Sequence, residues 1–290
     1  MVVLDGATIS ARWHHHRVPA RLHHERLARP GSTPARALIL THGIYGSGSN
    51  WRGVARKLTD RRPDWSVVLV DLRLHGRSEA GEPPHTIAAC AADLRALIDE
   101  LGDVGALAGH SFGGKVVLAT RATAPPGLLQ TWMLDASPSA RPEAERDPGN
   151  SVAAVLELME RLPRTWSRRD DFVAAVVAAG HAPSLGQWLA MNVVPDASGT
   201  LVLRLDLAAI RAMLADYYAR DLWAVAFDPT LPGTVEIVIA ERSPTVSADD
   251  RARLAAAPPH VHVHRIAAGH WLHIDAPSAV VELLVSSLPT

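Results

Sequence analysis

Short β-branched runs alternate with Ala-, Leu- and Arg-rich stretches along most of this chain, and this alternation constrains its fold more than any other feature. The β-branched runs have the composition of buried strands, and the stretches between them have that of helices. We expect strands at 37–40, 67–70, 104–107, 132–134, 235–240 and 261–266. We expect helices at 50–61, 86–101, 112–123, 248–257 and 277–288. Strands alternating with helices predict an α/β fold, a mostly parallel sheet flanked by helices.

The alternation stops between residues 141 and 230, where the sequence gives no convincing strand. The large hydrophobic residues of this region lie in helical segments and include Leu156, Trp166, Phe172, Trp188, Met191, Met213, Tyr217 and Trp223. The segment opens with a polar stretch at 141–149 that contains Pro and Gly, as linkers do. We therefore predict a core made of 1–140 and 231–290, with a helical cap or lid at 141–230 inserted into it.

Composition and charge exclude several classes of protein. Of 290 residues 48% are hydrophobic and 20% charged, so the chain can bury a core. The formal net charge of −1 leaves no basic field to attract nucleic acid, and no uninterrupted apolar run is long enough to predict a membrane span. Cys90 is the only cysteine, which excludes an intrachain disulfide. We expect Cys90 to be a packed thiol. We expect the protein to be cytoplasmic, because the N-terminus lacks the pattern of a signal peptide and a single cysteine suits a reducing compartment.

Histidines cluster in two places where a metal site is conceivable. His14 to His16, His23 and His24 lie in a stretch expected to form an edge hairpin, and a solvated surface explains them better than a metal site. His260, His262 and His264 alternate along a predicted strand and share one face, where a solvated or packed role is again favoured. We therefore expect neither a metal nor another cofactor.

The run Gly109-His-Ser-Phe-Gly113 presents a serine between a predicted strand and a predicted helix. In this context the pattern G-x-S-x-G places the serine on a sharp turn, and glycines are needed because side chains at 109 and 113 would collide with the neighbouring strand and helix. The N–H of Phe112 then lies at a helix N-terminus, where negative charge is stabilised. The alternative is a merely structural Gly-rich turn. We favour Ser111 as a nucleophile and Phe112 as an oxyanion donor.

Two further segments supply partners for such a serine. The loop from Thr41-His-Gly-Ile-Tyr45 follows a predicted strand and can offer a second oxyanion donor, for which we select the N–H of Ile44. His42-Gly43 also serves to shape a tight turn, and both roles are compatible. His270 follows the last predicted strand and is our candidate for the general base, with His273 as its competitor one helical turn away.

Together these residues resemble the α/β-hydrolase superfamily, and in particular a short serine esterase branch with a GHSxGGK-type elbow, here Gly109–Lys115. The resemblance extends to Asp71-Leu-Arg-Leu-His-Gly-Arg-Ser78, similar to the family's D-x-R-x-H-G-x-S, and to Gly269-His-Trp-Leu-His273. It covers nearly all of the core and little of the cap. It implies chemistry by a Ser-His-acid triad without a cofactor, and structural roles for Arg73 and His75.

The sequence departs from the family pattern at the acid of the triad. Most relatives carry Asp in a turn after the seventh strand, but here that turn reads Ala240-Glu-Arg-Ser243 and a serine fills the slot. Two carboxylates at strand ends can replace it, namely Asp135 and Glu241. We favour Asp135 as the acid, with Ser243 as an auxiliary hydrogen-bonding neighbour. Asp135 as a loop cap, and Ser243 as part of a helix-entry turn, are the structural alternatives.

These features predict a serine hydrolase that cleaves carboxylic esters or thioesters of small or medium-sized apolar acyl groups through an acyl-enzyme. The expected partner is a small-molecule ester, while the natural substrate and oligomeric state stay open. Lactonases, C–C bond hydrolases and cofactor-free haloperoxidases share the fold and remain alternatives. The alternative from another class is a ligand-binding receptor or adaptor on a hydrolase scaffold.

Overall fold

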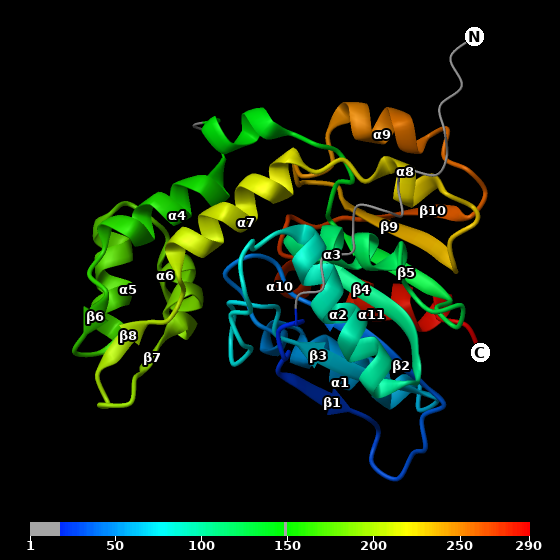
Figure 1. The fold of residues 1–290 in the computed structure, drawn as a ribbon, viewed down its shortest axis with the longest axis horizontal. Helices are drawn as coiled ribbons and strands as arrows, with labels where there is room; N and C mark the ends of the chain where they lie inside the picture. The colour runs from blue at the N-terminus through cyan, green and yellow to red at the C-terminus, as the bar shows by residue number, and fades with distance from the viewer. Residues whose placement is uncertain (1–17, 148–149) are drawn as a thin grey trace.

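A seven-stranded sheet forms the centre of the computed structural model, which describes residues 18–147 and 150–290 (Figure 1). Its strands are β1 (His24–Leu27), β2 (Arg36–Thr41), β3 (Trp65–Val70), β4 (Val104–His110), β5 (Gln130–Leu134), β9 (Thr234–Ala240) and β10 (Val261–Ile266). They lie in the order β1-β3-β2-β4-β5-β9-β10, and all neighbouring pairs are parallel except β1 with β3. All six strands predicted from the sequence are confirmed, with boundaries that differ by at most three residues.

Helices cover both faces of this sheet. On one face α1 (Arg52–Arg61) and α11 (Pro277–Ser287) pack together, and the other carries α2 (Ile87–Leu101), α3 (Phe112–Arg121) and α9 (Ala248–Leu254). These five helices are the five that the sequence predicts. The short helices η2 (Gly48–Trp51) and α10 (Leu272–Asp275) also belong to the core.

Strand β3 shows why the sequence pattern of the core is a continuous apolar run. Val67 and Leu69 pack with the α1 and α11 face, whereas Val68 and Val70 pack with the α2 and α3 face. Successive side chains of a strand point to opposite faces, and both faces are covered here, so every residue of β3 is buried.

Between β5 and β9 the chain leaves the sheet and forms what we call the insertion, residues 142–219, which stands beside the core in Figure 1. Its elements are η3 (Pro142–Arg146), α4 (Ser151–Arg161), β6 (Thr165–Trp166), α5 (Arg169–Ala178), α6 (Pro183–Leu189), η4 (Ala190–Asn192), β7 (Val193–Pro195), β8 (Leu201–Leu203) and α7 (Leu207–Ala219). The expectation that this region contains no strand is wrong, because β6, β8 and β7 form a small antiparallel sheet. Strands of two or three residues are too short to leave a period-2 pattern in the sequence.

Trp223 does not belong to the insertion, although the sequence places it among the cap aromatics. It begins helix α8 (Trp223–Phe227), which packs against α3 of the core. Its indole is fully buried and donates a hydrogen bond from Nε1 to Oγ of Ser139 at 2.7 Å. Trp223 is therefore a packing residue of the core.

The described N-terminal region contributes the edge strand β1, and the part of the expected hairpin that falls on residues 1–17 lies outside the described residues. Strand β1 pairs antiparallel with β3 and carries His24, and His23 precedes it. His14 to His16 lie outside the described residues. Cys90 is buried in α2, which confirms the prediction of a packed thiol. Among the helices of the described residues, none has the length and apolar character needed to cross a membrane.

Candidate active site

Ser111 occupies a strained turn between β4 and α3. Its φ of 52° and ψ of −113° lie outside the regions that a side-chain-bearing residue prefers. The turn is closed by glycines, since a Cβ on Gly109 would lie 2.1 Å from the carbonyl oxygen of Gly113, and one on Gly113 would lie 2.6 Å from that of His42. The predicted elbow geometry is therefore present, and it holds the serine at the carboxyl end of the central strand.

Asp135 lies immediately after β5 and faces the loop that follows β10. Its Oδ2 is 2.7 Å from Nδ1 of His270, and its Oδ1 accepts the N–H of Ala240 at 3.1 Å. The N–H of Asp135 donates to the carbonyl of Val238 at 2.8 Å, so the intervening strand β9 holds both backbone and carboxylate. The carboxylate is fully buried. This arrangement pairs the two residues that we predicted as acid and base.

The pairing also fixes which nitrogen of His270 carries a proton. A carboxylate accepts hydrogen bonds, so Nδ1 donates to Asp135 and Nε2 of the neutral ring has a free lone pair. Within the described residues neither Nε2 of His270 nor Oγ of Ser111 makes a hydrogen bond. Catalytic hydrogen bonds of this kind often form only when substrate binds.

The turn after β9 contacts His270 through a threonine that the sequence reasoning missed. Oγ1 of Thr245 lies 3.1 Å from Nδ1 of His270, and Oγ of Ser243 donates to Oγ1 of Thr245 at 3.0 Å. Ser243 thus reaches the imidazole only through Thr245. Glu241, the alternative acid, is exposed and makes no side-chain hydrogen bond or ion pair within the described residues. The sequence feature that could have pointed to Thr245 is its hydroxyl group, two residues after Ser243, which fills the usual acid position.

His110 connects the elbow to the loop that carries His270. Its Nε2 donates to the carbonyl oxygen of His270 at 2.8 Å, and the two rings lie 4.6 Å apart between centroids. Burial holds the pKa of His110 well below its ordinary value, so the ring stays neutral. Because His110 precedes Ser111 directly, this contact places the candidate base beside the candidate nucleophile.

Two backbone N–H groups lie free near Ser111. No hydrogen bond within the described residues occupies the N–H of Phe112 or that of Ile44. Gly43 packs against the elbow so closely that a Cβ on it would lie 3.4 Å from Cβ of Ser111. The N–H of Tyr45, by contrast, donates to Nε2 of His75 at 3.2 Å. The free donors are therefore the two predicted for the oxyanion hole.

His273, the competitor of His270, has both ring nitrogens buried without a hydrogen-bond partner in the described residues. The centroid of its ring lies 5.0 Å from that of Trp51, with the two rings tilted, and burial lowers its pKa to about 4. No carboxylate orients it, so it lacks the partner that His270 has.

Two buried histidines, His42 and His75, connect the 41–45 loop with the 71–78 loop. His42 donates from Nδ1 to the carbonyl of Gly43 at 2.7 Å and accepts the N–H of Leu72 at Nε2 at 3.0 Å. His75 donates from Nδ1 to the carbonyl of Arg73 at 2.8 Å. Burial lowers the pKa of both rings, that of His75 to about 3. Each is a neutral connector between the 41–45 loop and the 71–78 loop.

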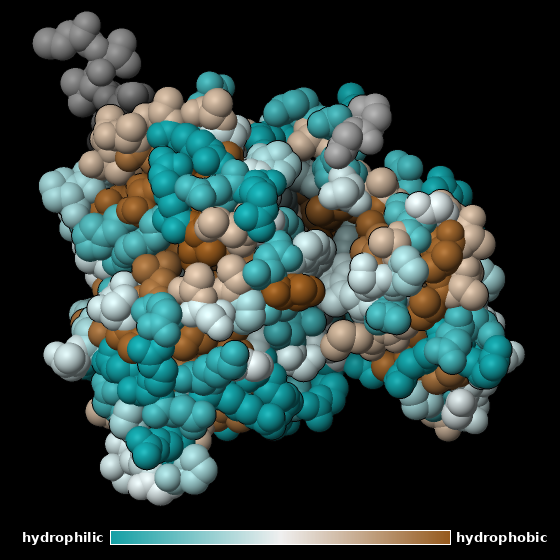
Figure 2. Space-filling model, turned by 180° about the vertical axis from the view of Figure 1, so that it is seen from behind, coloured by the Kyte–Doolittle hydropathy of each residue, from teal (hydrophilic) through white to brown (hydrophobic). Residues whose placement is uncertain are grey.

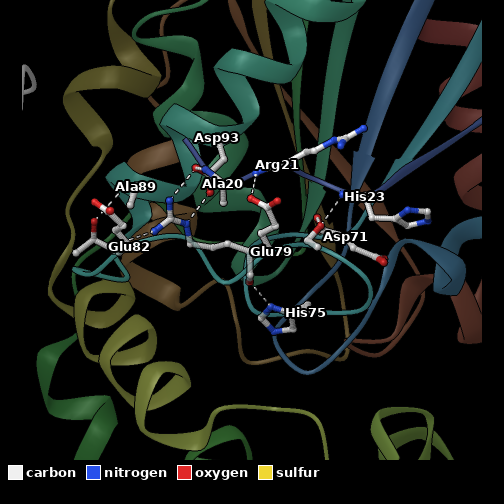
Figure 3. A network of polar contacts seen from close by, with 12 residues as sticks. Ala20, Arg21, His23, Asp71, His75, Glu79, Glu82, Ala89 and Asp93 are labelled. Atoms are coloured by element: carbon white, nitrogen blue, oxygen red, sulfur yellow. Dashed lines mark hydrogen bonds and ion pairs between the residues drawn. The ribbon is translucent and has the colours of Figure 1, made fainter. Parts of the chain in front are cut away.

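The 71–78 loop is itself held by buried charges (Figure 3). Asp93 accepts a bidentate pair of hydrogen bonds from Arg73 at 2.6 and 2.7 Å and a third from the N–H of Ala20. Asp71 accepts the N–H groups of Gly48 and Arg77. These contacts fit the structural roles expected for Arg73 and His75.

Lys115 ends the GHSFGGK run and ties the elbow helix to the insertion. Its Nζ donates to the carbonyl oxygens of Ser139, Tyr217 and Arg220 at 2.7, 2.7 and 2.8 Å. Tyr217 and Arg220 lie at the C-terminal end of α7, where helix carbonyls carry partial negative charge. Burial lowers the pKa of Lys115 to about 7.

The alternating histidines of β10 are engaged in packing and pairing. Nδ1 of His262 and Nε2 of His264 both contact the carboxylate of Glu236, at 2.9 and 2.7 Å, and His264 stacks on Trp132. His260 contacts the carbonyl of Ala226. Within the described ranges no group of three His, Cys, Asp or Glu side chains is arranged to hold a metal.

A family model described as the alpha/beta hydrolase family matches residues 38–283, which include Ser111, Asp135 and His270. This chain belongs to the alpha/beta hydrolase family. Its fold is accordingly the α/β-hydrolase fold, as the resemblance of the elbow and its flanking motifs implied.

Curated relatives of this hydrolase include lipases and esterases. It is 31% identical over 256 residues to sn-1-specific diacylglycerol lipase ABHD11 of Xenopus tropicalis, covering 84% of this chain and 75% of the relative. It is 29% identical over 252 residues to esterase YbfF of Escherichia coli (strain K12), covering 85% and 91%. Among solved structures, a marine microorganism esterase superposes with a TM-score of 0.80 at 21% identity, covering 93% of this chain and all of that one.

Proposed function

We propose that this protein is a serine hydrolase that cleaves carboxylic esters, and thioesters, of small or medium-sized apolar acyl groups. Membership of the family and the lipases and esterases among its relatives support ester hydrolysis. The observation that carries the proposal is the contact of Asp135 with His270 beside the Ser111 elbow.

Each group of the site has a defined role in the mechanism. His270 takes the proton of Ser111 at Nε2 as Oγ attacks the acyl carbon, and Asp135 stabilises the imidazolium that results. The N–H groups of Phe112 and Ile44 stabilise the oxyanion. His270 then returns the proton to the leaving alcohol or thiol, and a water activated by the same ring releases the acid from the acyl-enzyme.

An apolar acyl group is favoured because aromatic rings join the insertion to the catalytic loops. Trp188 of α6 makes an edge contact with Trp271 at 4.7 Å between ring centroids and another with Tyr45 at 6.4 Å. Trp271 follows the candidate base directly. Figure 2 shows a hollow between the larger and the smaller part of the molecule where hydrophobic residues reach the surface. The insertion thus acts as a cap over the catalytic groups.

Labelling with a fluorophosphonate tests the nucleophile. We expect stoichiometric labelling of the wild-type protein at Ser111 and none of Ser111→Ala, with aryl-ester hydrolysis lost in the variant and its thermal melt unchanged. A hydrolysis-competent Ser111→Ala variant would contradict the mechanism. Absence of both labelling and turnover in the wild type would favour a binding protein on a hydrolase scaffold.

A substrate series then defines the acyl group. p-Nitrophenyl esters from acetate to palmitate, the corresponding thioesters, a lactone and a diacylglycerol should be compared by kcat/KM. We expect the highest values for esters of short or medium chains. A preference for the lactone, or hydrolysis of none of these, would overturn the proposed substrate class.

A further inference from the structure

Tyr45 adopts a backbone conformation that its side chain disfavours. Its φ of 65° lies in the left-handed region, which is uncommon for a bulky residue. It follows Ile44, whose N–H is the second proposed oxyanion donor, and it is almost completely buried. Such strain persists only where the surroundings hold the residue in place.

Three hydrogen bonds hold Tyr45, and two of them come from the insertion. Its N–H donates to His75 in the core. Its carbonyl oxygen accepts from Nδ2 of Asn192 in η4 at 2.9 Å, and its hydroxyl donates to the carbonyl of Val152 in α4 at 2.9 Å. Asn192 is itself buried, so water cannot readily replace it. The insertion therefore holds Tyr45 at both its backbone and its side-chain end.

We propose that the insertion completes the oxyanion hole through these two hydrogen bonds. Asn192 is then the positioning residue that orients the Ile44 N–H, because it fixes the Tyr45–Gly46 peptide at the end of the same turn. The inference rests on the proposed function. Asn192 does not act on substrate directly. Its amide holds the Tyr45 carbonyl, so the backbone of residues 44 and 45 keeps the left-handed turn that leaves the Ile44 N–H free.

This role predicts a particular kinetic signature. An oxyanion donor acts mainly in the transition state, so misaiming it lowers kcat more than it changes KM. We expect Asn192→Leu to lower kcat about 10- to 100-fold, which is at most comparable to the fall in kcat when an oxyanion donor is removed altogether. KM should stay within about twofold of the wild-type value. Tyr45→Phe, which removes only the hydroxyl contact, should lower kcat by about two- to tenfold.

A transition-state analogue separates positioning from general loosening of the insertion. An alkyl trifluoromethyl ketone forms a bond to Ser111 and places an oxyanion in the hole, whereas the matching trifluoromethyl carbinol fills the same pocket without forming one. In Asn192→Leu the ketone should lose affinity by about the factor lost in kcat/KM. Affinity for the carbinol should be unchanged.

The matched control is Gln187→Leu, which replaces an exposed amide in the same part of the insertion. It should have wild-type kinetics. Asn192→Ser keeps a hydrogen-bond donor on a small side chain and should retain more activity than Asn192→Leu. It replaces the leucine variant in the comparison if that variant does not fold.

Equal losses of affinity for the ketone and the carbinol, or a raised KM with normal kcat, would overturn the inference while leaving the hydrolase mechanism intact. Absence of Ser111-dependent hydrolysis in the wild type would instead overturn the proposed function.

Discussion

Asp135 and His270 are 135 residues apart in the sequence, yet Oδ2 of one lies 2.7 Å from Nδ1 of the other. The contact forms because β5 and β10 both flank β9, and parallel strands bring their carboxyl ends to one edge of the sheet. The N–H of Ala240, the last residue of β9, fixes the other carboxylate oxygen.

This geometry predicts the effect of removing the carboxylate charge. Asp135→Asn should lower kcat by up to ~10⁴-fold, or about 5.5 kcal/mol, as in the serine-protease triad, because the amide can neither stabilise the imidazolium nor select the same tautomer. Glu241→Gln should have almost no effect, since Glu241 is exposed. Steady-state kinetics with a thermal melt for each variant make the comparison. A large fall in kcat for Glu241→Gln, together with a small one for Asp135→Asn, would assign the acid to the turn after β9.

The two histidines of the final loop should differ sharply. His270→Ala should abolish esterase activity, because among the described histidines His270 is the one that contacts a buried carboxylate beside Ser111. His273→Ala should keep most of it and mainly lower the melting temperature, because it removes packing against Trp51. Activity and thermal melts of both purified variants decide this, and equal losses of activity with intact folding would leave the base unassigned.

The hydroxyl groups after β9 should have smaller and ordered effects. Thr245→Val removes a group 3.1 Å from His270, and a neutral hydrogen bond contributes about 0.5–1.5 kcal/mol, roughly two- to tenfold in kcat. Ser243→Ala should cost less, since Ser243 reaches His270 only through Thr245. The reverse order of kcat values would mean that Ser243 contacts the imidazole during turnover.

Buried neutral histidines predict a loss of stability in acid. The pKa of His75 is lowered from 6.5 to about 3 by burial, so the unfolded chain binds the proton first as the pH falls. The stability is complete above pH 6.5 and is lost progressively between pH 6.5 and about 3, by at most about 1.4 kcal/mol per pH unit for one group. His75→Gln can keep both hydrogen bonds without titrating.

Urea denaturation between pH 7.5 and pH 4 measures this slope. The free energy of unfolding of His75→Gln should fall less steeply than that of the wild type. The slope should not vanish, because His42 and His110 also have lowered pKa values. Parallel curves for the two proteins would show that His75 does not contribute.

The sequence by itself determined the core and the candidate nucleophile. Strand and helix periods are local, and the runs around β2, β3, β4 and β9 are apolar because both faces of the sheet are covered. The elbow could also be predicted from the sequence, because the turn has no room for a Cβ at Gly109 or Gly113 and both glycines lie within five residues. His270 followed from its position after the last strand.

The tertiary structure decided everything that depends on contacts between distant segments. It paired Asp135 with His270, placed Thr245 between Ser243 and the imidazole, and left Glu241 exposed. It also formed the small sheet of the insertion, whose strands are too short to leave a pattern. The hydrogen bond from Asn192 to Tyr45 joins residues 147 apart in the sequence. No local propensity encodes such a contact, because it forms only when the core and the insertion pack against each other.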